Sequence, residues 1–138
     1  MFLQSRKNLL GVQNFVLRVI NNNCPELKAF LEGSRQDKRV NLTLVVMVVP
    51  LANGKLQLNE TFYAITQELS VTGMGIVLDQ QRSLDHIILG FSFEGSMTFI
   101  HATAKHLTPM GGGFYHLGLE MTEVVPGCKY PQLETLRF

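Results

Sequence analysis

Two arginines stand four positions apart in the segment Ser34-Arg35-Gln36-Asp37-Lys38-Arg39. A guanidinium group is a flat fork of donors that matches a phosphate or the O6/N7 edge of guanine, and its face can stack on a base. A segment with two such groups can grip a nucleotide that carries several phosphates. Taken alone, the pair is more typical of a solvated charge cluster beside Asp37.

A second polar group follows in Glu68-Leu69-Ser70-Val71-Thr72-Gly73-Met74-Gly75, where one predicted strand ends and the next begins. A carboxylate can accept hydrogen bonds from the N1–H and N2–H₂ edge of guanine, and a serine hydroxyl can donate to a phosphate oxygen. We expect Gly73 to take a positive φ that lets the backbone approach a ligand. The alternative is a plain turn between strands, since Ser, Thr and Gly are common there.

Catalytic and metal-binding patterns are weak. His101 and His106 are five positions apart and would lie on opposite faces of a regular strand, and no pair of the four histidines has a usual metal-ligand spacing. Ser70 is not in a G-x-S-x-G motif, and Gly111–Gly113 lacks the Lys-Ser/Thr of a phosphate-binding loop. We therefore expect no enzyme, no metal and no cofactor.

The elements that must position these groups differ along the chain. Residues 8–20 and 25–32 have apolar residues at helical spacing, so we expect two N-terminal helices packed on the rest or on another chain. After Arg39 the pattern is β-rich, with hairpin turns at Asn53-Gly54 and Glu94-Gly95. Such a pattern favours an antiparallel sheet closed into a small barrel. The expected strands are 40–49, 55–69, 74–78, 86–93, 97–107 and 114–121, and residues 132–136 could form one helical turn.

Composition limits the class of protein. The chain has 138 residues, fits one domain and carries a net charge of +1, which excludes a protein that coats DNA through bulk charge. Residues 1–39 carry a net +4 and residues 40–138 a net −3. Cys24 and Cys128 form no CxxC pair, no export signal is evident, and the longest apolar run, 42–52, is too short to span a membrane. We expect a cytoplasmic protein with reduced thiols.

The chain resembles the PilZ domain family in two motifs taken together. These are Arg35-x-x-x-Arg39, ahead of a β-rich segment, and Glu68-x-Ser70-x-x-Gly73, about thirty residues later. That family is a small β-barrel whose members commonly bind the bacterial second messenger cyclic di-GMP, and its motifs are Arg-x-x-x-Arg and (Asp/Asn)-x-Ser-x-x-Gly. The resemblance covers roughly residues 34–122, including the strand that ends in 115–120. It implies a mainly β fold: a six-stranded antiparallel PilZ-like barrel at 34–125, with N-terminal helices at 1–33 and a C-terminal tail at 126–138.

The resemblance also implies a site. Arg35 and Arg39 would contact the phosphates and guanines of cyclic di-GMP, while Ser70 and Gly73 would line the strand side. Glu68 stands where the family has Asp or Asn, so its acceptor lies one methylene further out and it adds a negative charge. Ligand would draw the arginine segment onto the barrel and signal to a partner protein in motility or exopolysaccharide regulation. The alternative is a module of the same fold that binds no nucleotide and uses its N-terminal apolar stripe in a homodimer or partner contact.

Overall fold

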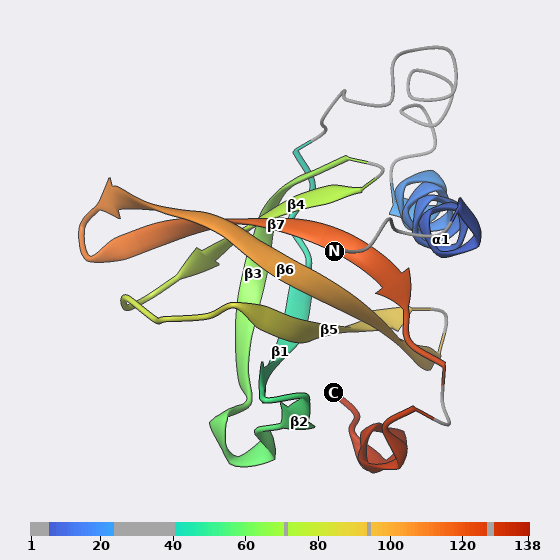
Figure 1. The fold of residues 1–138 in the computed structure, drawn as a ribbon. Coiled ribbons are helices and arrows are strands. Elements are labelled where there is room, and N and C mark those ends of the chain that lie inside the picture. Colours follow the sequence, from blue (N-terminus) through green and yellow to red (C-terminus); the bar gives the residue numbers. More distant parts are fainter. Residues whose placement is uncertain (1–5, 24–40, 71, 94, 127–128) are drawn as a thin grey trace.

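A computed structural model describes residues 6–23, 41–70, 72–93, 95–126 and 129–138. The described residues form one α-helix, seven strands and two short 3₁₀ turns (Figure 1). In chain order these are α1 (Arg6–Asn23), β1 (Val45–Ala52), β2 (Lys55–Leu56), η1 (Leu58–Glu60), β3 (Phe62–Leu69), β4 (Gly73–Leu78), β5 (His86–Phe93), β6 (Ser96–Gly111), β7 (Phe114–Val124) and η2 (Pro131–Thr135).

Six of the strands close into an antiparallel barrel. The order of neighbours is β1-β3-β4-β7-β6-β5, and β5 pairs back onto β1 through Met47↔Gly90 and the pairs beside it. The short strand β2 pairs with the end of β1 and is not one of the six strands that close the barrel. The prediction of a mainly β, six-stranded antiparallel barrel is therefore confirmed.

The first helix closes one end of this barrel. Its apolar residues at helical spacing are buried in the same core as the inward side chains of the strands, and Phe15 packs edge-on against Phe91 and Phe93. Figure 1 shows α1 at the end of the barrel opposite the β6–β7 hairpin. The N-terminal apolar stripe is thus used inside the molecule, so its expected role as an exposed contact surface is wrong. The helix expected at 25–32 lies outside the described residues.

Two strands of the barrel are buried on both faces. In β1, Val46 and Val48 point into the barrel core, while Met47 and Val49 belong to a second apolar cluster on the outside. That cluster is completed by residues of β5, the end of β7 and the tail: Ile88, Val125 and Leu133. The tail therefore covers the outside of the β1–β5 pairing, and the helical turn expected near residues 132–136 is the 3₁₀ turn η2.

The turns lie where the sequence predicts them, whereas several strand ends differ from the prediction. Asn53 and Gly54 both have positive φ, as the predicted two-residue hairpin requires, and Gly95 does too. The segment 55–69 is not one long strand, because η1 separates β2 from β3. The first strand begins at Val45 rather than at residue 40. Within the described residues, α1 and the other helical turns include none with the length and apolar character needed to cross a bilayer.

Candidate functional site

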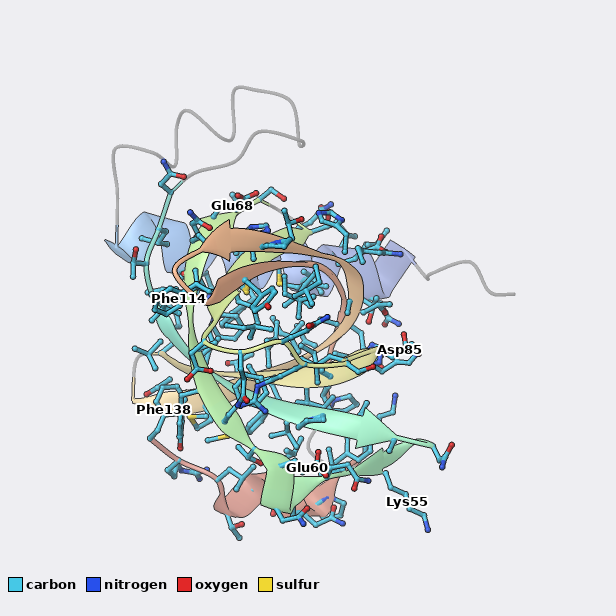
Figure 2. The ribbon with its side chains drawn as sticks, turned by 90° about the vertical axis from the view of Figure 1, so that its left-hand side faces the viewer. Lys55, Glu60, Glu68, Asp85, Phe114 and Phe138 are labelled. Atoms are coloured by element: carbon cyan, nitrogen blue, oxygen red, sulfur yellow. The ribbon has the colours of Figure 1, made fainter. Side chains whose placement is uncertain are left out.

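A row of four residues runs straight across the outer face of the barrel. Glu68 of β3 stands opposite Gly75 of β4, Gly75 opposite Gly118 of β7, and Gly118 opposite His106 of β6. The two glycines leave a low floor between the carboxylate and the imidazole. Figure 2 shows Glu68 on the outside of the barrel, away from its core.

A second imidazole lies over this floor. A Cβ atom added to Gly75 would come within 2.3 Å of Nε2 of His116, and one added to Gly118 within 2.8 Å of Nε2 of His106. The His116 Nε2 atom is 3.6 Å from Oε1 of Glu68, too long for a hydrogen bond, and has no hydrogen-bond partner among the described residues. Both histidines therefore lie where only glycine leaves room for them.

All of these residues except Gly75 line a cavity of about 470 Å³, which we call the outer-face cavity. Its volume lies within the range of small-molecule sites. Lys105 and Glu120 lie on its lining and pair with each other at 3.0 Å, each with about half of its side chain exposed. The lining contains two carboxylates, two imidazoles, two hydroxyls and one ammonium group among its residues: Glu68, Ser70, Thr72, Gly73, Met74, Lys105, His106, His116, Gly118, Leu119 and Glu120.

The turn between β3 and β4 is held by Ser70. Its backbone N–H donates to the carbonyl of Gly73 at 2.9 Å, and its hydroxyl oxygen accepts from the N–H of Gly73 at 3.0 Å. The side chain is almost fully buried, so this hydroxyl is chiefly a part of the turn. Gly73 is absent from the residues with positive φ, so the expected left-handed conformation there is wrong.

The chain enters the barrel beside the same turn. The hydroxyl of Thr66 donates to the carbonyl of Leu42 and accepts from the N–H of Leu44 at 2.8 Å, and the N–H of Thr66 donates to the carbonyl of Leu44 at 2.8 Å. Residues 42–44 therefore lie along β3, with residue 42 nearer to Glu68 than residue 44 is. Arg35 and Arg39 precede this stretch and lie outside the described residues, so their contacts with the cavity stay a prediction.

Three of the five predicted site residues, Glu68, Ser70 and Gly73, are thus brought to one cavity. The prediction missed His106 and His116. Its argument from strand spacing was wrong for His106, because β-bulges in β6 shift the register and leave Lys105 and His106 beside the outer-face cavity. The available signal was the pair Gly75 and Gly118, since glycine inside a strand often marks a close approach.

No family model matches the chain, and no curated protein matches it. One similar solved structure is titled "Structure of Bacillus subtilis Inhibitor of motility (MotI/DgrA)", a PilZ-domain protein. It is 18% identical, with a TM-score of 0.49 over 70% of this chain and 46% of that chain. This chain therefore matches less than half of the length of that protein, and no activity follows from the likeness.

Proposed function

We propose that this chain is a PilZ-like receptor domain that binds cyclic di-GMP at the outer-face cavity and signals through its arginine segment. One observation carries the proposal. Glu68, Ser70 and Gly73, the second of the two motifs, meet at one cavity on the outside of a six-stranded antiparallel barrel. The proposed role is binding without catalysis, in the cytoplasm of a bacterium.

The position of the chain entry supports the role of the arginines. Arg39 precedes Leu42 by three positions, and Leu42 is tied to β3 through Thr66. An extended chain covers about 3.5 Å per residue, so this tether limits how far Arg39 can be from the end of β3. Arg35 and Arg39 would then supply bidentate donors to the phosphates and stack on the guanines.

The imidazoles over the glycine floor suit a flat ligand. A planar base can stack on the rings of His116 and His106, which occupy the space over Gly75 and Gly118, and Glu68 can accept from the N–H groups of its edge. The imidazole of His116 lies 3.6 Å from the carboxylate of Glu68. Longer than Asp or Asn, Glu68 reaches across this floor toward His116.

The proposed mechanism is a rearrangement of the segment between α1 and β1 on ligand binding. Because α1 is packed into the barrel core through Val12, Phe15, Val16 and Val19, its displacement would expose apolar surface. Ligand is therefore expected to rearrange the arginine segment rather than α1. A partner protein would recognise the rearranged segment.

Calorimetric titration with cyclic di-GMP tests the proposal. We expect heat of binding for the wild-type protein, weaker binding at raised salt, and no binding for Arg35→Ala or Arg39→Ala. Arg137→Ala is the matched control, because its guanidinium donates to the carbonyl of Leu136 and does not line the cavity. Unchanged affinity in Arg39→Ala, with the melting temperature also unchanged, would refute the site.

A second candidate function, a contact module without nucleotide, is favoured by one surface. Val45, Tyr63 and Ile65 are exposed on neighbouring positions of β1 and β3. Together with the exposed Phe114 they line a small cavity of about 230 Å³. Contiguous apolar surface of this kind often marks protein contacts. This function predicts a dimer in sedimentation velocity that Ile65→Glu disrupts, together with no heat on titration with cyclic di-GMP.

A further inference from the structure

The end of the barrel opposite α1 contains a second cavity, of about 510 Å³. Figure 2 looks onto this end of the molecule. The loop between β4 and β5 forms one side of the cavity, and β6 and β7 form the other. We call it the barrel-mouth cavity; it is lined by Gln81, Arg82, Ser83, Leu84, Ala104, Lys105, His106, Leu107 and Leu117.

The guanidinium group of Arg82, at this cavity, lies over an aromatic ring and has a buried nitrogen without a hydrogen-bond partner among the described residues. Its guanidinium carbon lies 3.8 Å from the centre of the Phe62 ring, which fixes the group by a cation–π contact. Its Nε atom is buried and has no hydrogen-bond partner among the described residues. No ion pair with Arg82 occurs in the described part of the chain either. A guanidinium with a desolvated N–H is costly unless an acceptor satisfies it.

The charges around this cavity are of one sign. Its charged lining residues are Arg82 and Lys105, and no Asp or Glu lines it. Lys105 is partly neutralised by Glu120 at 3.0 Å, so Arg82 carries the uncompensated charge. Asp79 and Asp85 flank the loop in the sequence, but neither contributes to the lining.

We propose that the barrel-mouth cavity binds an oxyanion, a phosphate or carboxylate group attached to a small apolar body. The fork of Arg82 would bind the oxyanion through two parallel hydrogen bonds, with the amide of Gln81 and the hydroxyl of Ser83 as further donors. Leu84, Leu107 and Leu117 would receive the apolar body. This cavity shares Lys105 and His106 with the outer-face cavity, but the proposed oxyanion contacts use neither Glu68 nor the arginine segment, so they do not depend on cyclic di-GMP binding.

Nuclear magnetic resonance of the ¹⁵N-labelled protein tests the proposal through the Nε–H signal of Arg82. The probes are octyl phosphate, octanoate, inorganic phosphate and octanol, each titrated separately. We expect both octyl anions to shift this signal and to bind more tightly than inorganic phosphate, and octanol to leave it in place. The relative affinities of octyl phosphate and octanoate decide which oxyanion the cavity prefers.

Two variants separate binding from packing. Arg82→Gln should weaken binding of the preferred octyl anion by about 10- to 100-fold, as expected for loss of a charged hydrogen-bond donor. Arg18→Gln is the matched control, because Arg18 also lies over an aromatic ring, that of Phe15, but on α1 at the other end of the barrel. The proposal is overturned if no oxyanion shifts the Arg82 signal at millimolar concentration. Equal binding to wild type and Arg82→Gln, measured from the backbone amides of residues 81–84, would overturn it as well.

Discussion

At the scale of single residues, two glycines decide the form of the outer-face cavity. Gly75 and Gly118 lie within strands, where glycine normally weakens a sheet. Here the missing side chains leave room for the rings of His116 and His106. The polar groups of the cavity thus depend on residues that have no functional group of their own.

Gly75→Ala should disturb this arrangement. Its new methyl group would lie 2.3 Å from Nε2 of His116 and 3.1 Å from Cγ of Glu68, so both side chains must move. We expect a loss of about 1–3 kcal/mol in the free energy of unfolding, measured by urea denaturation. In a His116→Ala background the same change should cost less, because the main clash is gone. An equal cost in both backgrounds would show that His116 is not what Gly75 accommodates.

His101 should make stability depend on pH. Burial lowers the pKa of His101 below its ordinary value of 6.5, and His86, stacked on it with ring centres 5.3 Å apart, lowers this pKa further. Glu123 acts in the opposite direction, and Lys129, paired with Glu123, lowers the pKa. The folded state therefore holds this proton less tightly than the unfolded chain does. The stability due to neutral His101 is present above about pH 6.5 and is lost as pH falls below it.

Urea midpoints measured at about pH 8 and about pH 5.5 check this expectation, because they bracket the unperturbed histidine pKa. The wild-type midpoint should fall more on acidification than that of His101→Gln. The hydrogen bond between Nδ1 of His101 and Oγ1 of Thr122, 2.5 Å long, is lost in the variant at both pH values, so the comparison isolates the titration. Equal falls in the two proteins would contradict the assignment.

At the scale of elements, the turns were the most predictable part of the chain. Asn53-Gly54 and the strand at residues 86–93 could be read from local chemistry, because positive φ and a bounded apolar run are local properties. The break at η1 between β2 and β3 could not, since the residues 55–69 have no glycine or proline to mark it. The register shift in β6 that leaves Lys105 and His106 beside the outer-face cavity depends on pairing with β7, which the sequence of β6 alone does not specify.

The candidate site, too, was predictable only where its residues are close in sequence. Glu68, Ser70 and Gly73 are close in sequence, so their shared turn was predictable. The histidines come from two other strands and join the cavity only through the closed sheet order. Ser70 looked like a ligand donor, yet its hydroxyl accepts from Gly73 within the turn, a use equally consistent with its sequence context.

The helix α1 should behave as part of the barrel core. Phe15 is 4% exposed and contacts Phe91 and Phe93, so Phe15→Ala removes a large buried ring. We expect a loss of about 3–5 kcal/mol in the free energy of unfolding. Leu10→Ala, on the exposed side of the same helix, should change it by about 0.5 kcal/mol or less. Similar small effects of both changes in thermal denaturation would show that α1 is only loosely attached.

At the scale of the whole molecule, apolar side chains form two clusters on either side of one pair of strands. The inner cluster fills the barrel, and the outer cluster lies between the β1–β5 pairing and the tail. This double burial explains why β1 has an almost continuous apolar sequence instead of alternating residues. At this point β1 packs against Val125 and Leu133, which lie 76 to 86 positions further along the chain.

Leu133→Ala tests the outer cluster. Leu133 is 4% exposed on η2, and its truncation should lower the free energy of unfolding by about 2–5 kcal/mol. Amide hydrogen exchange should become faster in β1 and β5 more than in β4 and β7. The exposed neighbour Gln132, replaced by Ala, serves as the control and should alter neither quantity. A uniform increase in exchange across all six barrel strands would argue against a local role for the tail.

Burial on both sides has a consequence for how β1 finds its partner. In most sheets a shift of one residue would turn apolar side chains to water, and that cost rejects the wrong alignment. For β1 the shift would exchange one apolar set for another, so hydrophobicity gives little discrimination. Steric fit must therefore select the register of β1. The tight turn at Asn53-Gly54 fixes the end of β1. Further back in the strand, Met47 pairs with Gly90, where a Cβ atom on residue 90 would lie only 3.0 Å from the ring of Phe99. The correct register of β1 thus depends on steric fit at a few small residues rather than on the difference between burying and exposing apolar side chains.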